Sequence, residues 1–122
     1  MAKILIVDDS ETIRIQLRKD LESRSHVVHE GVDGLDGLTQ LQNLDGIELI
    51  ICDVNMPKMD GLSMVAKISQ EPRYAGIKIF MLTTEGSVDM KSRGKEAGVK
   101  AWITKPYIAE KLLSAIEKIC QK

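Results

Sequence analysis

Acidic residues follow directly on two of the most apolar segments of this 122-residue sequence. Asp8 and Asp9 come after KILIV, and Asp53 comes after ELIIC. Carboxylates brought together in a partly desolvated cleft repel one another, so such a site favours a bound cation. An all-oxygen ligand set with room for water suits Mg²⁺, particularly where a phosphate completes the octahedron. These residues therefore predict a magnesium site in which a carboxylate can act as a nucleophile toward a phosphoryl group.

Hydroxyl and ammonium groups follow two later apolar segments. Thr83 and Thr84 come after one of them, and Thr104, Lys105 and Pro106 end the other. A lysine ammonium is a good point-charge partner for one phosphoryl oxygen, and a hydroxyl can donate a hydrogen bond to another. If all these apolar segments are strands of one sheet, the phosphoryl-binding groups and the carboxylates meet at one edge.

The chain alternates between short apolar runs and segments with apolar residues at helical spacing. The predicted strands cover residues 3–9, 26–30, 48–53, 77–82 and 100–104, and the predicted helices cover residues 10–23, 33–44, 61–70, 87–98 and 108–120. The first helix begins at an N-cap, Ser10, and should carry Arg14 and Arg18 on its outward face. The fourth helix should be held loosely, because it has little apolar periodicity and contains Gly94.

Strands that alternate with helices predict a doubly wound α/β fold with a five-stranded parallel sheet. The strands read as continuous apolar runs, which indicates that helices cover both faces of the sheet. One domain over residues 1–122 accounts for the chain, which contains no long linker, internal repeat or low-complexity tract. Ligands of such folds bind beyond the carboxyl ends of the strands, where Asp8, Asp9, Asp53 and Lys105 should converge.

The composition is that of a globular protein, with 43% hydrophobic and 29% charged residues. The net charge of -1 is unevenly spread, since residues 1–85 carry 9 Lys/Arg against 14 Asp/Glu and residues 86–122 carry 8 against 4. There is no concentrated basic and aromatic patch, so nucleic-acid binding is not expected. The chain runs from Met1 directly into a strand, and no apolar run approaches membrane-spanning length. We expect a cytoplasmic protein that binds no membrane.

The cysteines and histidines offer no metal site. Cys52 and Cys120 lack any metal-type spacing and predict free thiols in a reducing compartment. His26 and His29 are three residues apart on a predicted strand, so their side chains face opposite ways and cannot share a metal. We expect both histidines at the surface.

Four motifs are distributed along the whole chain: Asp8-Asp9 after KILIV, Asp53 in DVNMPKMDG, Thr83 in MLTTEG, and Lys105-Pro106 in WITKPY. Together they are highly specific, whereas any one of them alone is weak. With these motifs the sequence resembles the receiver domain of two-component response regulators over its whole length, and more narrowly the stand-alone receivers of chemotaxis. The resemblance implies the flavodoxin-like strand order 2-1-3-4-5.

The resemblance also implies a phosphorylation site. Asp53 would be the phospho-acceptor, which takes a phosphoryl group from a histidine kinase or from a small donor. Mg²⁺ would be held by the side chains of Asp9 and Asp53 and by the backbone carbonyl of Asn55, with Asp8 acting chiefly through water. Lys105 would pair with the phosphoryl group. The protein would then be no enzyme beyond its own phosphorylation and dephosphorylation.

A conformational switch is implied as well. Thr83 would swing to donate a hydrogen bond to the bound phosphoryl group, beside Thr84, which stands where a small residue is frequent. Trp102 occupies the position of the switch aromatic, which is usually Tyr or Phe, and would turn inward as the threonine moves. This would remodel the face made by the fourth helix, fifth strand and fifth helix, which is the output face. The peptide bond before Pro106 would be cis.

Asn55 and Glu85 match the chemotaxis type, in which a polar and an acidic side chain help to orient water for hydrolysis. This match implies a short-lived phosphorylated state. The partners implied are a histidine kinase of the chemotaxis type, a flagellar motor switch protein and a phosphatase. The protein itself is expected to be a monomer.

Other functions are compatible with parts of this pattern. A phosphorelay intermediate or phosphate sink would look nearly the same. A haloacid-dehalogenase-like phosphatase also uses a nucleophilic aspartate with Mg²⁺, but it needs a second acid two residues later, where this chain has Asn55. A flavodoxin-type electron carrier shares the fold, but its first loop must cradle a phosphate, which Asp8 and Asp9 would repel.

Overall fold

The computed structural model describes residues 1–120 and confirms the predicted alternation of strands and helices. The strands are β1 (Lys3–Val7), β2 (Val27–Gly31), β3 (Leu49–Cys52), β4 (Lys78–Thr83) and β5 (Ala101–Thr104). The helices are α1 (Glu11–Glu22), α2 (Gly34–Gln42), α3 (Gly61–Ser69), the short 3-10 helix η1 (Pro72–Tyr74), α4 (Val88–Glu96) and α5 (Ala109–Ile119). The longest of them, α1, has 12 residues, and within residues 1–120 none has the length and hydropathy required to cross a bilayer.

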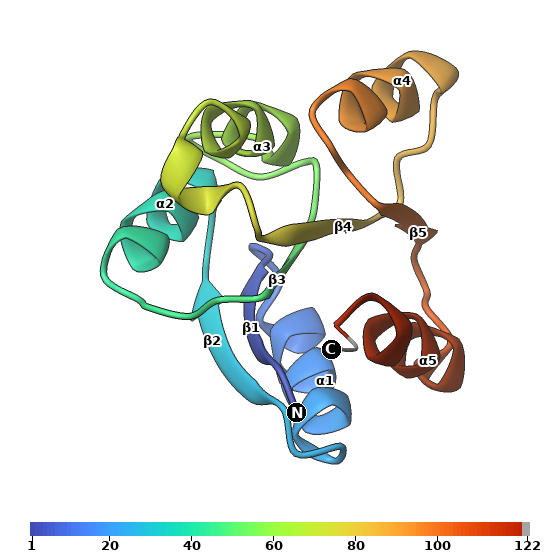
Figure 1. The fold of residues 1–122 in the computed structure, drawn as a ribbon. Helices are drawn as coiled ribbons and strands as arrows, with labels where there is room; N and C mark the ends of the chain where they lie inside the picture. The colour runs from blue at the N-terminus through green and yellow to red at the C-terminus, as the bar shows by residue number, and fades with distance from the viewer. Residues whose placement is uncertain (121–122) are drawn as a thin grey trace.

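All paired strands run parallel, and their order is β2-β1-β3-β4-β5, as predicted. Helices α1 and α5 cover one face of the sheet, and α2, α3 and α4 cover the other (Figure 1). The chain therefore leaves β1 toward one face and β3 toward the opposite face. Between these two neighbouring strands the connections diverge, which opens a crevice at the carboxyl edge of the sheet.

Each face of the sheet has its own hydrophobic core. On the side of α1 and α5 the buried residues include Ile4, Ile6, Leu17, Leu21, Ile51, Leu112 and Ile116. On the side of α2 and α3 they include Leu5, Val7, Leu41, Ile50, Cys52, Met64 and Val65. Because successive strand residues point to opposite faces and both faces are covered, the strands carry uninterrupted apolar runs.

Four helices begin at a side chain that caps the backbone: Ser10, Asp33, Asp60 and Ser87. Each of these side chains accepts a hydrogen bond from the N–H group three residues later, which satisfies a donor that the helix leaves unpaired. The predicted cap at Ser10 is thus confirmed. Asp60, which follows Asp53 in the same acidic loop, serves as the cap of α3.

The prediction that Arg14 lies on the outward face of α1 was wrong. Its side chain is only 13% exposed, because it turns toward the sheet. The Arg14 Nε group donates to Glu30 Oε1 at 3.0 Å, and Nη1 donates to the Asp8 carbonyl at 2.6 Å. Arg18 is more exposed and donates to the second oxygen of Glu30 at 2.7 Å. The acidic residue of β2 thus draws both arginines toward the strand.

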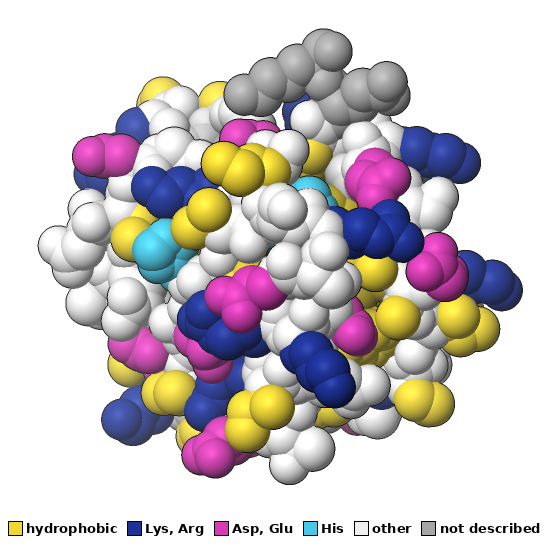
Figure 2. Space-filling view, turned by 90° about the horizontal axis from the view of Figure 1, so that it is seen from below, with side chains coloured by type: hydrophobic (Ala, Val, Ile, Leu, Met, Phe, Trp, Pro, Cys, Tyr) yellow, Lys and Arg dark blue, Asp and Glu magenta, His cyan; other side chains and the backbone are white. Residues whose placement is uncertain are grey.

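Charges of both signs are mixed on the surface. The face in Figure 2, seen from below the view of Figure 1, shows Lys and Arg side chains interspersed with Asp and Glu. Arg24 pairs with Glu110 and Glu117 of α5, and Arg18 pairs with Glu22 within α1. Exposed pairs of this kind contribute little to stability, about 0 to 1 kcal/mol each. On this face no patch of a single sign is visible that would attract nucleic acid.

His26 is buried, so its predicted place at the surface was wrong. It is 8% exposed, and its Nδ1 atom accepts a hydrogen bond from the Ala2 N–H group at 2.9 Å. Since Nδ1 is an acceptor, the neutral ring carries its proton on Nε2, which is buried without a hydrogen-bond partner among residues 1–120. His29 is partly buried. Burial is the main cause that lowers the pKa of His26.

Lowering the pH is expected to destabilise the protein through His26. Above pH 6.5, the ordinary pKa of histidine, the ring is neutral in the folded and the unfolded chain. Below it the unfolded chain binds a proton first, so the free energy of unfolding falls by up to about 1.4 kcal/mol per pH unit until the folded ring is protonated too. Urea unfolding between about pH 7.5 and about pH 5 measures this loss. The variant His26→Asn keeps an acceptor but does not titrate. Equal pH dependence of stability in both proteins would show that His26 is not the cause of the loss.

Candidate functional site

Three charged side chains from different strand ends meet at the carboxyl edge of the sheet. Asp8 follows β1, Asp53 follows β3 and Lys105 follows β5. The Lys105 Nζ atom lies 2.8 Å from Asp8 Oδ2 and 2.8 Å from Asp53 Oδ2. Asp8 is 2% exposed and Asp53 is 8% exposed. The predicted convergence is confirmed, and the ammonium group bridges the two buried carboxylates.

The backbone fixes the orientation of both carboxylates. Asp8 Oδ1 accepts the Ser10 N–H group at 2.9 Å, and Asp53 Oδ1 accepts the Val54 N–H group at 2.7 Å. Each carboxylate therefore has one oxygen on a backbone donor and the other on Lys105. Buried charges are tolerated only when they are paired and hydrogen-bonded in this way.

The pKa shifts reflect this crowded charge cluster. Burial raises the pKa of Asp8, and the charge of Asp53 adds to the rise, while Lys105 and the Ser10 N–H group oppose it. Burial also acts to lower the pKa of Lys105, but its hydrogen bonds to Asp53 and Asp8 outweigh that effect, so the pKa is raised. Lys105 is therefore charged at neutral pH.

Asp9 completes an acidic cluster that fits a hard divalent cation. The ligand atoms of Asp8, Asp9 and Asp53 all lie within 4.8 Å of one another. Asp9 is exposed, which leaves one side of the cluster open to water. Carboxylate oxygens with room for water are the ligands that Mg²⁺ prefers, so the donor set matches the predicted magnesium site. The further ligand expected from Asn55, its backbone carbonyl, stays a prediction.

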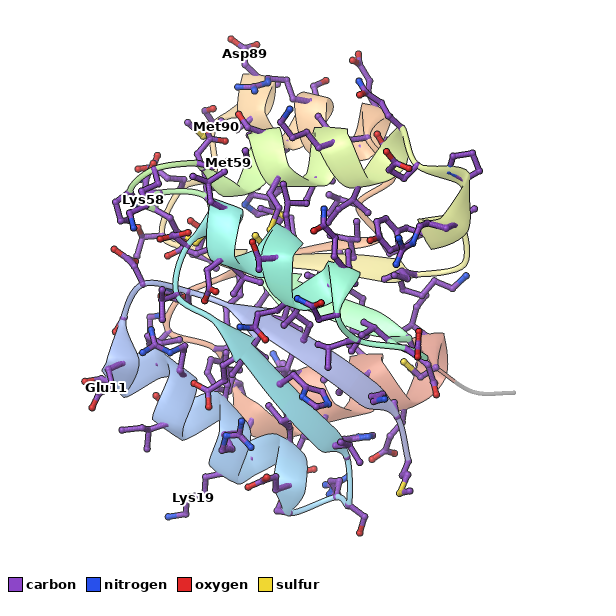
Figure 3. All side chains as sticks on the ribbon, turned by 90° about the vertical axis from the view of Figure 1, so that its left-hand side faces the viewer. Glu11, Lys19, Lys58, Met59, Asp89 and Met90 are labelled. Carbon is purple, nitrogen blue, oxygen red and sulfur yellow. The ribbon has the colours of Figure 1, made fainter. Side chains whose placement is uncertain are left out.

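Gly61, for which no role was predicted, lets the loop between β3 and α3 pack closely against Asp53. Its N–H group donates to the Val54 carbonyl at 2.8 Å. A Cβ atom at this position would lie 1.8 Å from the Asp53 carbonyl oxygen. Figure 3 shows Lys58 and Met59 of the same loop on the side of the molecule where Glu11 begins α1. The site lies at this edge.

The predicted switch and dephosphorylation residues lie on neighbouring loops of the same edge. Thr83 is fully buried at the end of β4, and its carbonyl accepts the Lys105 N–H group at 2.9 Å. The Thr83 Oγ1 atom accepts the N–H group of Glu85 at 3.2 Å. Asn55 Nδ2 donates to Glu85 Oε1 at 2.7 Å, which joins the loop after β3 to the loop after β4. Thr84 is exposed beside them.

The indole N–H group of Trp102, on β5, donates a hydrogen bond to the Glu85 carbonyl at 2.8 Å. The ring packs against the core on the side of α2 and α3 and is partly buried. The peptide bond between Lys105 and Pro106 is cis, as predicted. A movement of Trp102 on phosphorylation stays a prediction.

A hydrogen bond that was not predicted joins the loop after Pro106 to α1. The Tyr107 hydroxyl donates to Asp20 Oδ2 at 2.6 Å. Burial, followed by the bond to Asp20, raises the pKa of Tyr107, so the hydroxyl keeps its proton. Nothing in the spacing of these residues could have indicated the contact, because they are 87 positions apart.

Comparisons with known proteins agree with this geometry. Residues 4–117 match the family described as the response regulator receiver domain. A chemotaxis protein CheY homolog of Campylobacter jejuni is 34% identical over 118 residues, which cover 96% of this chain and 91% of that protein. The sensor histidine kinase CheAY of Helicobacter pylori is 33% identical over 116 residues, which cover 94% of this chain but 14% of the kinase.

The fold is also that of known receivers. A solved structure of the Vibrio cholerae chemotaxis protein CheY4 superimposes with a TM-score of 0.90 at 37% identity, and 98% of each chain is covered. Strand order, acidic cluster, bridging lysine and family match thus agree, which argues against the flavodoxin and haloacid-dehalogenase alternatives. This chain belongs to the response regulator receiver domain family.

Proposed function

We propose that this protein is a single-domain response regulator that accepts a phosphoryl group on Asp53 from a histidine kinase. The observation that carries the proposal is the position of the Asp53 carboxylate, 2.8 Å from Lys105 Nζ in the crevice between β1 and β3. A buried carboxylate with a fixed cationic neighbour is a suitable nucleophile for a phosphoryl group, because the same cation can neutralise the phosphoryl oxygens.

The chain's own residues account for the transfer step. A carboxylate oxygen of Asp53 attacks the phosphorus atom, and the bond between phosphorus and the donor breaks, with its electron pair leaving on the donor. Lys105 pairs with one phosphoryl oxygen, and the Thr83 hydroxyl, at the end of the neighbouring strand, donates to another. Mg²⁺ held by Asp8, Asp9 and Asp53 would supply further neutralisation of the phosphoryl charge.

Reversal of the switch uses the same edge of the sheet. The side chain of Asn55, two positions after the acceptor, is hydrogen-bonded to that of Glu85, and the pair would orient a water molecule for hydrolysis of the acyl phosphate. This chemistry acts only on the protein's own phosphoryl group, so the protein is a switch and not an enzyme with external substrates. The short-lived phosphorylated state expected from the sequence belongs to the same proposal.

The output is proposed to pass through protein partners of a cytoplasmic monomer. The relatives include chemotaxis proteins, which supports a chemotaxis-type kinase as donor, and a flagellar motor switch protein and a phosphatase as targets of the face of α4, β5 and α5. Within residues 1–120 neither Cys52 nor Cys120 is in a disulfide, which suits a reducing compartment. The carboxyl edge and this face meet at Trp102, so a change at Asp53 can alter the surface that partners contact.

Incubation with acetyl phosphate and Mg²⁺ is expected to add one phosphoryl group to most molecules. Chelation of the metal with EDTA should suppress the addition by more than about tenfold, because the single charge of Lys105 cannot neutralise both the acidic cluster and the incoming phosphoryl group. Intact mass spectrometry measures the adduct. If the protein stays unmodified with Mg²⁺, or if EDTA makes no difference, the proposed mechanism is wrong.

A pull-down with and without beryllofluoride, a phosphoryl mimic, tests the chemotaxis output against the phosphorelay alternative. A motor switch protein or phosphatase bound only with the mimic supports a chemotaxis output. Capture of a histidine phosphotransfer protein in both states would instead favour a phosphorelay intermediate or phosphate sink.

A further inference from the structure

Glu85 connects three elements of the carboxyl edge through hydrogen bonds from its three polar parts. Its N–H group donates to Thr83 Oγ1 at 3.2 Å, and its carboxylate accepts from Asn55 Nδ2 at 2.7 Å. Its carbonyl accepts from Trp102 Nε1 at 2.8 Å. The indole of β5 is therefore connected, through one residue, to the amide that lies two positions after Asp53.

Gly94 determines where the indole can lie. It is the buried residue of α4, and a Cβ atom there would lie 3.0 Å from Trp102 Cζ3 and 3.4 Å from Cε3. A helix backbone and an aromatic ring are both stiff, so an added methyl group would displace the ring. Glycine destabilises a helix interior relative to alanine, and the space that the indole occupies gives a structural reason for glycine at this position.

We propose that Trp102 and Gly94 are positioning residues for hydrolysis of the phosphoryl group on Asp53. The inference rests on the proposed function. Gly94 leaves room for the ring, the N–H group of the ring donates to the Glu85 carbonyl, and the Glu85 carboxylate accepts from the Asn55 amide, two positions after the acceptor. The face to which α4 and β5 belong would thereby influence the lifetime of the phosphorylated state.

The step that these residues assist is simple hydrolysis. A water oxygen attacks phosphorus, the bond between phosphorus and the Asp53 oxygen breaks, and the electron pair returns to the carboxylate. Inorganic phosphate leaves, and the proton of the water passes to it or to solvent. Asn55 and Glu85 can orient this water only while their side chains are held together.

The Glu85 segment has few other restraints. Thr84 and Gly86, on either side of it, are both exposed. Loss of the indole hydrogen bond should let the Glu85 backbone shift and weaken the alignment with Asn55. Uptake of the phosphoryl group should change little, because Asp8, Asp53 and Lys105 are held by separate bonds.

The test is a single-turnover measurement. Native protein and variants are loaded with acetyl phosphate and Mg²⁺, the donor is removed, and loss of the phosphoryl group is followed by intact mass. Trp102→Phe, which keeps an aromatic ring but not the N–H group, and Gly94→Ala should slow hydrolysis several-fold, less than the roughly hundredfold loss that a 1 Å misplacement of a reacting group can cause. Ser92→Ala, at an exposed position of α4, is the matched control and should leave the rate unchanged.

A double variant separates positioning from a general structural effect. If Trp102 acts through Glu85 and Asn55, then Trp102→Phe should slow hydrolysis in the native background and have no further effect in Asn55→Ala. Unchanged or faster hydrolysis in Trp102→Phe, or an equal slowing in both backgrounds, would overturn the inference. Should Gly94→Ala fail to fold, Trp102→Phe decides alone. Absence of phosphoryl uptake by the native protein would instead overturn the proposed function, and the inference with it.

Discussion

Replacement of Asp53 by asparagine is expected to abolish phosphoryl uptake, with a loss of more than about a thousandfold in rate. An amide is nearly the same size as a carboxylate, so the side chain still fits, although its single oxygen can keep only one of the two hydrogen bonds that Asp53 accepts from Val54 and Lys105. An amide lacks the negatively charged oxygen that attacks phosphorus, so the acyl phosphate cannot form. Intact mass after incubation with acetyl phosphate and Mg²⁺ measures the loss.

Asp89→Asn is the matched control for this prediction. Asp89 is exposed in the first turn of α4 and projects away from the body of the protein in Figure 3. This variant changes the charge by the same amount but lies outside the acidic cluster, so it should take up the phosphoryl group as the native protein does. An adduct that persists in Asp53→Asn would mean that another carboxylate is the acceptor.

Replacement of Gly61 by alanine is expected to lower the free energy of unfolding by about 3 kcal/mol or more. The new Cβ atom would lie 1.8 Å from the Asp53 carbonyl oxygen and 2.8 Å from its carbonyl carbon. Both are backbone atoms at the end of β3, so the start of α3 must move away from the strand. The Gly61 hydrogen bond to Val54 would be strained at the same time. Urea unfolding measures the loss, and phosphoryl uptake should fall with it.

Gly76→Ala controls for the general effect of adding a methyl group. An ideal Cβ at Gly76 meets no atom within 4 Å, and the residue is exposed. This substitution should change stability by less than about 1 kcal/mol, in the stabilising direction, because alanine restricts the unfolded chain. Equal stabilities of Gly61→Ala and Gly76→Ala would show that the loop can relax around the added group, and the prediction would be wrong.

The fold could be predicted because each strand is covered on both faces. Residues such as Leu5 and Ile6 point to opposite cores and are both fully buried, so β1 needs an apolar side chain at every position. That requirement appears in the sequence as a continuous apolar run, which differs from the helical spacing of Leu17 and Leu21 in α1. The local patterns thus predicted that strands alternate with helices, and a parallel sheet follows from this alternation.

Other features depend on contacts between elements, and the predictions for them were wrong. Arg14 was expected in solvent, but it bonds Glu30, 16 positions away on β2. His26 was also expected in solvent, but it accepts a hydrogen bond from Ala2, 24 positions away. In a helical or strand pattern each of these residues looks polar and therefore exposed. Whether a polar side chain is buried depends on the partner that the neighbouring element provides.

The sequence by itself determined the elements and the acidic, hydroxyl and ammonium groups at their ends, because parallel strands bring their carboxyl ends to one edge. Asp53 and Lys105 could be assigned to one site on that ground. Only the tertiary structure decided how these groups are held in place. Part of that support comes from glycines in close contact with neighbouring atoms, and a glycine in a sequence does not indicate which atoms it contacts. Gly61 against the Asp53 carbonyl and Gly94 against the Trp102 ring are read from neighbouring atoms alone. Space between packed elements is a property of their three-dimensional fit, which a linear pattern does not contain.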